Sequence, residues 1–145
     1  MKFEKSCGIV VFTRIDDENK YVLVQSKRGH FGFPKGHVEE GETEIETAKR
    51  EVFEEVRLSP TIISGFRKVS EYLIPNTDIK KQVIFFLGFY KSGEIIVQET
   101  ELNNAVLVSY DDAMDLLKHE NNKKLLMEAN NYLHFLGEEI NRWLY

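Results

Sequence analysis

The chain has 145 residues, of which 42% are hydrophobic and 30% charged, and its formal net charge is −5. These values predict a single globular domain over residues 1–145 with a hydrophobic core. The sequence contains no apolar run of about 18 residues, so no membrane span is predicted. The negative charge argues against general nucleic-acid binding through a basic surface.

Two apolar runs near the amino terminus predict neighbouring strands. Residues 6–13 read SCGIVVFT and residues 21–25 read YVLVQ, and both have the composition of buried strands. A polar turn over residues 16–19 separates them. The single cysteine, Cys7, cannot form an internal disulfide and is expected to be a small buried side chain. Together with an amino terminus that lacks the apolar core of a signal peptide, this predicts a reducing cytoplasmic location.

Residues 33–42, FPKGHVEEGE, predict a loop that is built for close ligand approach. Pro34 fixes the backbone before Gly36, and the two glycines, Gly36 and Gly41, permit tight turns. Thr43 and Glu46 then have the spacing of a capping box, which predicts that a helix begins here.

Residues 43–57 predict that helix, and its apolar stripe consists of Ile45, Ala48, Val52 and Val56. Glu51, Glu54 and Glu55 stand at i, i+3 and i+4, so their side chains crowd one side, roughly 110° around the helix from the stripe. Neighbouring carboxylates repel one another unless a cation lies among them, and hard oxygen ligands suit Mg²⁺ or Mn²⁺. An ordinary solvated glutamate face is the alternative, but the position of the carboxylates beside the buried stripe favours a metal site.

The rest of the chain alternates between strands and helices. Strands are predicted over residues 61–74 (interrupted at Gly65), 82–90, 95–97 and 105–108, and helices over residues 111–118 and 122–143. The last helix carries an apolar stripe that is expected to join the core, consisting of Leu125, Leu126, Ala129, Leu133, Leu136, Ile140 and Leu144. Strands and helices in this order predict a sheet between layers of helices.

The loop and the glutamate-rich helix together resemble the Nudix box, G-x5-E-x7-R-E-U-x-E-E-x-G-U, where U is a bulky aliphatic residue. The matching positions are Gly36, Glu42, Arg50, Glu51, Val52, Glu54, Glu55 and Leu58. One position departs from the pattern, because Arg57 stands where the family has glycine. A glycine there suits a left-handed helix end, so the substitution puts the helix terminus in doubt but not the metal ligands.

This resemblance implies an α/β (α+β) fold, an α/β/α sandwich around a mixed sheet with the box as a loop–helix–loop. It also implies that Mg²⁺, or Mn²⁺ in its place, is held by the Gly36 carbonyl and by Glu51, Glu54 and Glu55, with Glu42 as an outer carboxylate. The implied reaction is attack of water on a phosphoanhydride. The expected catalytic residues are Glu54, Arg50 as an orienting partner of the carboxylates, and a late-loop glutamate, for which Glu101 is favoured over Glu99.

Outside the box the chain is similar to the asymmetrical bis(5'-nucleosyl)-tetraphosphatases, which implies a dinucleoside polyphosphate substrate such as diadenosine tetraphosphate, cleaved to ATP and AMP. The residues expected to bind substrate are Lys35, His37, Tyr72 and Lys81. Nucleoside triphosphates or RNA 5'-triphosphate ends are alternative substrates, and a Nudix-fold module that binds a nucleotide without cleaving it is a third reading. The expected partner is thus a small nucleotide, with no membrane, with nucleic acid disfavoured, and with the oligomeric state left open.

Overall fold

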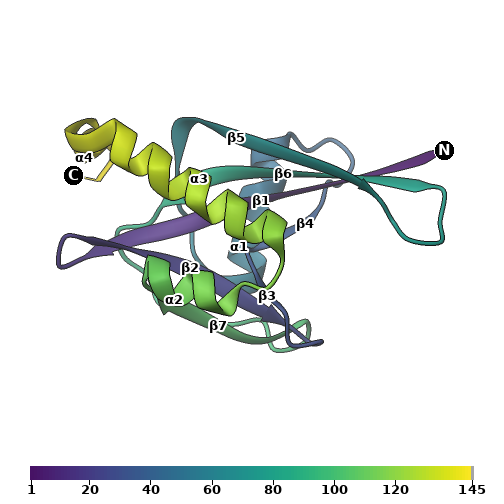
Figure 1. Ribbon diagram of the computed structural model, residues 1–145, viewed down its shortest axis with the longest axis horizontal. Helices are drawn as coiled ribbons and strands as arrows, with labels where there is room; N and C mark the ends of the chain where they lie inside the picture. Colours follow the sequence, from purple (N-terminus) through teal and green to yellow (C-terminus); the bar gives the residue numbers. More distant parts are fainter. Residues whose placement is uncertain (145) are drawn as a thin grey trace.

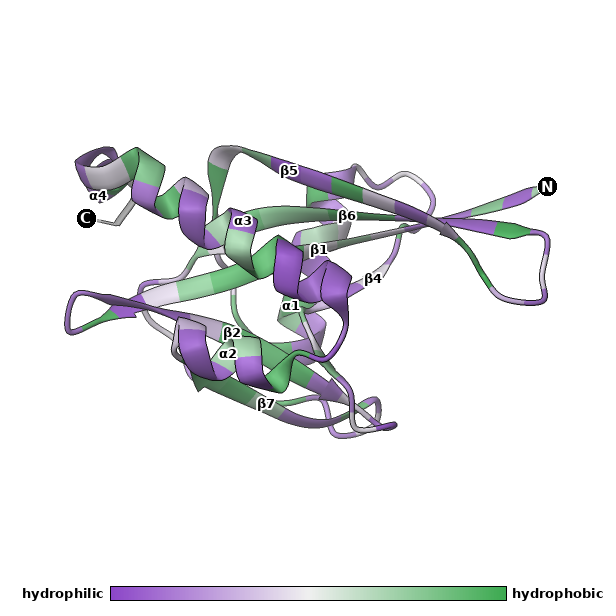
Figure 2. Ribbon diagram, viewed as in Figure 1, coloured by the Kyte–Doolittle hydropathy of each residue, from purple (hydrophilic) through white to green (hydrophobic). Residues whose placement is uncertain are grey.

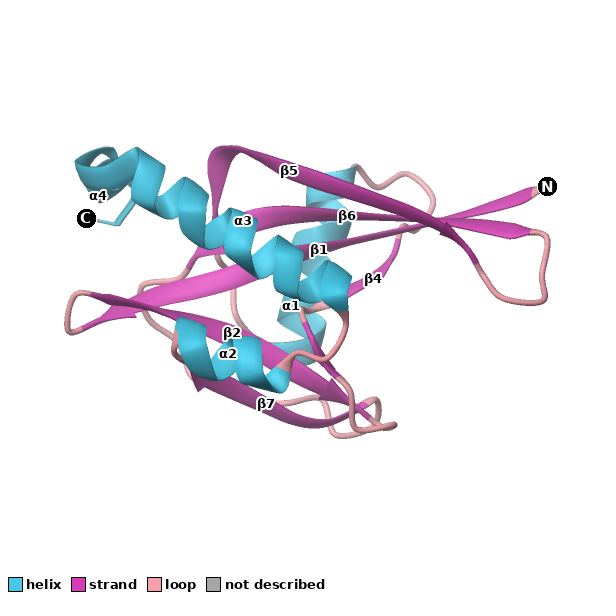
Figure 3. Cartoon of the chain, in the orientation of Figure 1, coloured by secondary structure: helices cyan, strands magenta, loops and turns pink. Residues whose placement is uncertain are grey.

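The computed structural model describes residues 1–144, and these form a mixed β-sheet between two layers of helices (Figure 1). The strands, in chain order, are β1 (Lys2–Ile15), β2 (Glu18–Ser26), β3 (Phe31–Gly32), β4 (Lys35–His37), β5 (Thr61–Leu73), β6 (Ile79–Phe89) and β7 (Leu102–Val108). The sheet runs in the order β3-β2-β1-β6-β5, with β4 added to β1 and β7 added to β2. Only β1 and β6 pair in parallel, so the predicted mixed sheet is confirmed (Figure 3).

The helices cover both faces of this sheet. Helix α1 (Glu44–Val56) lies behind it in Figure 1, whereas α2 (Tyr110–Leu116) and α3 (Glu120–Leu136) lie in front. Each face has its own apolar core, one packed under α1 and the other under α2 and α3. Along α3, hydrophobic and hydrophilic residues alternate in Figure 2, as expected for a helix with one buried side. The predicted sandwich is therefore confirmed.

Strand β1 changes partner along its length, and this positions the loop before α1. Its first half pairs with β4 through Ser6, Cys7 and Gly8, whereas its second half pairs with β2 from Phe12 to Ile15. Strand β4 therefore occupies the place beside β1 that β2 leaves. This arrangement holds the Lys35–His37 backbone against the sheet and directly beside α1.

Helix α1 begins as the sequence predicts. The Thr43 side chain accepts a hydrogen bond from the Glu46 backbone, and the Glu46 carboxylate accepts one from the Thr43 backbone. The apolar positions Ala48, Val52 and Val56 are fully buried against the sheet. Ile45 is 40% exposed, so its predicted place in the buried stripe is wrong: it lies in the first turn, where the helix has not yet reached the core.

Three other expectations need correction. Residues 95–97 form no strand, because the Ile96 and Gln98 N–H groups donate to the Val56 and Glu55 carbonyls at the end of α1, at 3.1 and 3.0 Å. The last helix is not continuous, since Gly137 at φ 51° ends α3 and is followed by a 3₁₀ helix (Gly137–Ile140) and α4 (Asn141–Leu144). The short strand β4 lies where a loop was expected, and β3 was not predicted.

The apolar stripe of the last helix is otherwise as predicted. The side chains of Leu125, Leu126, Ala129, Leu133 and Ile140 are buried, and Leu136 packs against them. The side chain of Leu144 is outside the described part of the chain. Within residues 1–144, no helix is long and apolar enough to span a membrane.

Candidate active site

The three glutamates of α1 differ in their exposure to solvent. Glu55 is buried, the Glu51 side chain is 15% exposed and the Glu54 side chain is 46% exposed. Their spacing thus places one carboxylate inside the protein, one at the boundary and one in solvent, along the side of the helix that adjoins β4.

Glu55 is the most perturbed of these carboxylates. Its Oε2 accepts a hydrogen bond from the Lys35 backbone N–H at 2.9 Å. Burial, and then the neighbouring charge of Glu51, raise the pKa of the Glu55 carboxyl to about 8. Burial also raises the pKa of Glu51, against the opposing effect of Arg50. Two such carboxylates side by side favour either a bound proton or a cation between them.

Gly36 lies directly against Glu51. It pairs with Cys7 across the β1–β4 ladder, and a Cβ atom at this position would overlap the Glu51 carboxylate. Glycine is therefore required here for close approach of backbone and carboxylate, as the loop sequence suggests. The predicted partners Gly36 and Glu51 are brought together.

The Arg50 guanidinium connects the loop and the helix. It donates to both oxygens of Glu42 at 2.6 and 3.1 Å, to Glu51 at 2.9 Å and to Glu54 at 3.2 Å. It also donates to the His37 carbonyl at 2.9 Å. The hydrogen bond from Arg50 lowers the pKa of Glu42 to about 2, so Glu42 is ionised at neutral pH. Arg50 thus contacts all three carboxylates, and its role as their orienting partner in catalysis stays a prediction.

Glu42 is fully engaged within the loop. Besides Arg50, it accepts hydrogen bonds from the Thr47 hydroxyl at 2.8 Å and from the Glu39 N–H at 3.0 Å. Its observed role is to fix Arg50 and the loop, and its outer role at a metal stays a prediction.

The donor set fits a magnesium ion of the kind that binds through few protein ligands. In the described chain, no three acidic, histidine or cysteine side chains converge into a closed cage. Mg²⁺ commonly takes one or two carboxylates and completes its shell with water and phosphate oxygens. Glu51, which lies against the Gly36 backbone, and Glu55, whose pKa the Glu51 charge raises, offer that arrangement.

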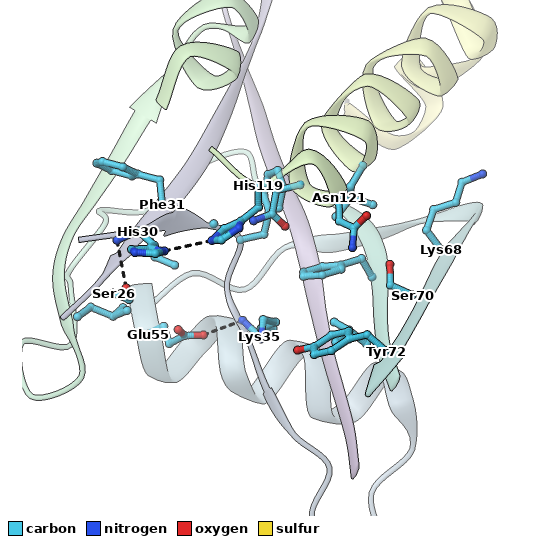
Figure 4. A pocket seen from close by; sticks show the side chains of 18 residues that line it. Ser26, His30, Phe31, Lys35, Glu55, Lys68, Ser70, Tyr72, His119 and Asn121 are labelled. Carbon is cyan, nitrogen blue, oxygen red and sulfur yellow. Dashed lines mark hydrogen bonds between the residues drawn. The ribbon is translucent and has the colours of Figure 1, made fainter. Parts of the chain in front are cut away.

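A cavity of about 630 Å³ opens from Glu55 on the α3 side of the sheet. Figure 4 shows Lys35 beside Glu55, with Lys68, Ser70 and Tyr72 on one side and His30 and Phe31 on the other. His119, which precedes α3, and Asn121 and Asn122 in its first turn also line the cavity, together with Val83 and Phe85 of β6. A partly apolar cavity of this volume with a few polar groups is typical of a small-molecule site.

The predicted substrate-binding residues fall into two groups. Lys35 and Tyr72 line the cavity, and partial loss of water lowers the pKa of the Lys35 ammonium while Glu55 and Glu51 act in the opposite direction. His37 and Lys81 contact each other outside the cavity lining, with 2.9 Å between Nε2 and Nζ. Lys81 is nearly buried, and this burial lowers its pKa.

The late-loop glutamates lie in the turn before β7. Glu101 is exposed, yet its charge contributes to the raised pKa values of both Glu51 and Glu55. Glu99 is not among the main causes of either shift. The favoured choice, Glu101, thus influences the Glu51 and Glu55 carboxylates electrostatically, while its catalytic role stays a prediction.

Several cavity residues were not anticipated from the sequence. Ser70, His119, Asn121 and Asn122 carry no motif, and the last three reach the cavity because α3 packs on β5. His30 also lines the cavity, and its Nδ1 lies 3.1 Å from Nε2 of His119.

Comparison with known proteins gives consistent results. Residues 5–129 match the NUDIX domain model. An asymmetrical bis(5'-nucleosyl)-tetraphosphatase from Sus scrofa is 32% identical over 141 residues, which cover 89% of this chain and 95% of that protein. An NAD-capped RNA hydrolase NudC from Haemophilus influenzae is 39% identical over 79 residues, covering 54% of this chain and 28% of that protein.

Solved structures show the same fold. The C. elegans Ap4A hydrolase binary complex superimposes with a TM-score of 0.82 at 23% identity, covering 90% of this chain and 98% of that one. The NUDIX domain of Shewanella oneidensis NrtR, complexed with ADP ribose, gives a TM-score of 0.72 at 17% identity and covers 89% of this chain and 87% of that one.

Proposed function

The chain belongs to the Nudix hydrolases, and from this premise we propose that it is a Mg²⁺-dependent pyrophosphohydrolase of dinucleoside polyphosphates. The proposed substrate is diadenosine tetraphosphate, hydrolysed asymmetrically to ATP and AMP. Mn²⁺ is the expected substitute metal.

The observation that carries this proposal is the carboxylate pair at the inner end of the cavity. Glu55 lines the cavity and is buried beside Glu51, and both have raised pKa values. The Lys35 side chain lines the same end. Anionic phosphate next to two carboxylates is repelled unless a divalent cation lies between them, so the geometry favours a metal-bridged polyphosphate.

Each residue of the site has a role in this scheme. A divalent cation held by Glu51, Glu55 and the Gly36 carbonyl would neutralise phosphate charge and lower the pKa of a bound water. Arg50 keeps Glu51 and Glu54 in position through its hydrogen bonds.

The proton of the attacking water needs an acceptor that is open to solvent. Glu54 is exposed and adjoins Glu51, which makes it the first choice, and Glu101 is the alternative. Lys35 would contact phosphate as a point charge, and Tyr72 offers an exposed ring on which a base could stack.

The choice of a dinucleoside substrate rests on similarity along the whole chain. The Sus scrofa relative is named for that activity and aligns over nearly its full length, whereas the likeness to NudC covers 28% of that protein. A nucleoside triphosphate or an RNA 5'-triphosphate end is the alternative substrate. A module that only binds nucleotides is disfavoured, because Glu51, Glu54 and Glu55 are all present.

A substrate panel tests this proposal. Purified protein with Mg²⁺ is incubated with diadenosine tetraphosphate, nucleoside triphosphates, ADP-ribose and capped RNA, and the products are separated by chromatography. The expected result is fastest turnover of diadenosine tetraphosphate with equal amounts of ATP and AMP. Faster cleavage of triphosphates would contradict the proposed substrate.

A pair of glutamine variants tests the site itself. Glu54→Gln should lower kcat by about 100-fold or more at saturating Mg²⁺, because a positioned base typically contributes 10²–10⁴-fold. Glu18→Gln, which neutralises an exposed glutamate in β2, is the matched control and should retain full activity. Undiminished turnover in Glu54→Gln would contradict its role as base and direct attention to Glu101.

A further inference from the structure

Helix α3 is fixed to the sheet through polar contacts of its second half, whereas its first turn borders the cavity. Asn121 and Asn122 in that first turn line the cavity. Three side chains of the second half contact polar groups of the strands: Glu128 pairs with Lys68 at 2.9 Å, Asn130 accepts from the Tyr21 hydroxyl at 2.7 Å, and the Tyr132 hydroxyl donates to the Ser64 carbonyl at 2.7 Å. The anchored half of the helix is therefore not the half that would contact a nucleotide.

The Tyr132 contact lies at an irregularity of β5. Residues 63–66 stand opposite Leu87 alone, so the ladder between β5 and β6 is interrupted there. The Ser64 carbonyl in this bulge is the group that accepts from the Tyr132 hydroxyl. Gly65 beside it adopts φ 91°, and a Cβ atom at this position would overlap the same hydroxyl. The bulge and the tyrosine are thus closely fitted to each other.

The bulge and α3 carry facing parts of the cavity wall. A bulge bends its strand and redirects the side chains that follow it. The part of β5 beyond this bulge carries Ser70 and Tyr72, and Figure 4 shows both on the strand that runs below Asn121 of α3. Tyr132 contacts both elements, so its hydroxyl bond helps to set their separation.

The length of α3 amplifies any displacement at Tyr132. Asn121 precedes Tyr132 in the same helix, and the rise of about 1.5 Å per residue puts the two roughly 16 Å apart along the axis. A tilt of about 4° at Tyr132 would therefore move the first turn by about 1 Å. A shift of that size is enough to impair the fit of a bound substrate.

We propose that Tyr132 is a positioning residue that sets the affinity of the cavity for its nucleotide, an inference that rests on the function proposed above. Tyr132 itself is not part of the cavity lining. The carboxylates belong to α1, which packs on the opposite face of the sheet (Figure 1). Loss of the Tyr132 hydroxyl should consequently weaken substrate binding and leave the chemical step unchanged.

Tyr132→Phe tests this role, because it removes the hydroxyl and keeps the ring that packs 5.8 Å from the Phe66 ring centroid. The KM for diadenosine tetraphosphate should rise by about fivefold, while kcat stays within about twofold. Steady-state kinetics at saturating Mg²⁺ measure both. A purely structural role would have the opposite signature, since a smaller folded fraction lowers kcat and leaves KM unchanged.

Tyr110→Phe is the matched control. It removes a hydroxyl from α2, and within residues 1–144 this helix contributes no side chain to the cavity lining. Its KM should equal that of the unaltered protein. Thermal unfolding of both variants shows that each is folded under the assay conditions.

Titration calorimetry with a non-hydrolysable diadenosine tetraphosphate analogue gives a readout that does not depend on catalysis. The Kd of Tyr132→Phe should rise by the same factor as its KM. Unchanged KM and Kd, a fall in kcat alone, or an equal rise in Tyr110→Phe would each overturn the proposal. If the unaltered protein binds the analogue but does not cleave diadenosine tetraphosphate, only the proposed function fails, because the two Kd values still decide the role of Tyr132.

Discussion

Gly36 shows how a single atom can control the site, because the space that its Cβ would fill is occupied by the Glu51 carboxylate. Gly36→Ala should therefore displace Glu51 and lower kcat/KM by about tenfold or more, since misplacement of a positioned group by about 1 Å is enough for such losses. Steady-state kinetics at saturating Mg²⁺ measure the effect, and thermal unfolding confirms that the variant folds.

A double-mutant cycle shows whether Gly36 acts through Glu51. In a Glu51→Ala background, the added Gly36→Ala substitution should cause little further loss, because the displaced carboxylate is already absent. Full additivity of the two losses would mean that Gly36 matters for another reason.

The Glu55 carboxyl links the site to stability in the absence of metal. Its pKa rises from 4.5 in the unfolded chain to about 8 in the folded protein, so the folded state binds this proton more tightly. The resulting stabilisation is complete below pH 4.5 and is lost as the pH rises through about 8.

Glu55→Gln should consequently stabilise the metal-free protein at alkaline pH. At about pH 9 we expect a Tm roughly 5 °C above that of the unaltered protein, with the difference disappearing near pH 4. Thermal unfolding in a chelating agent measures it, with the exposed Glu54→Gln as control. A difference of equal size at both pH values would show that lost ionisation is not the cause.

At the scale of the secondary-structure elements, the end of α1 is strained. Arg57 adopts a left-handed conformation, φ 62° and ψ 29°, at the position where the family pattern has glycine. Its N–H still donates to the Phe53 carbonyl at 2.9 Å, and its guanidinium lies 5.0 Å from the Phe53 ring centroid. The helix therefore ends where a glycine would end it, which resolves the doubt raised by the sequence.

Arg57→Gly should stabilise the protein by about 1 kcal/mol, because glycine adopts this conformation without the steric penalty of a Cβ atom. Arg57→Ala is the matched control: it removes the contact with Phe53 but keeps the Cβ atom, so it should not stabilise. Urea unfolding of the three proteins measures both effects. Equal stabilities of the glycine and alanine variants would mean that backbone strain is absent.

Local signals made α1 predictable, and non-local packing made other elements unpredictable. The capping box, the apolar stripe and the glutamate spacing all lie within residues 43–57. Residues 95–97 have the composition of a strand, yet the Ile96 N–H, like that of the next residue but one, Gln98, donates to a carbonyl at the end of α1 rather than to a neighbouring strand. Strand β4 exists only because β1 changes partner along its length. Neither the pairing of β4 with β1 nor the hydrogen bonds at the end of α1 can be predicted from a local sequence pattern.

The same distinction applies to the site. The Gly36–Glu51 contact follows from one continuous motif, so the sequence predicts it. His119 and Asn121 enter the cavity through the packing of α3 on the sheet, and nothing in their neighbourhood marks them. Sequence reasoning therefore anticipated Lys35 and Glu55 at the α1 end of the cavity and missed the residues that α3 brings to its other end.

In the whole molecule, the two faces of the sheet contribute different parts of one site. Helix α1 presents the carboxylates from one face, and α3 with β5 encloses the cavity on the other, with Glu55 and Lys35 at the junction. A polyphosphate that shares a metal with Glu51 and Glu55 must couple the two faces. Metal binding and nucleotide binding should therefore be cooperative, with a coupling free energy of about 1–3 kcal/mol.

Calorimetric titrations with a non-hydrolysable diadenosine tetraphosphate analogue measure this coupling in both directions. The analogue should tighten Mg²⁺ binding by the same factor by which Mg²⁺ tightens the analogue, since linkage requires reciprocity. Glu51→Gln should reduce both factors toward one, whereas Tyr72→Ala should weaken the analogue and leave the factor intact, because Tyr72 lies away from the carboxylates on β5. Analogue binding that is equally tight with and without Mg²⁺ would mean that the metal does not join the phosphates to α1.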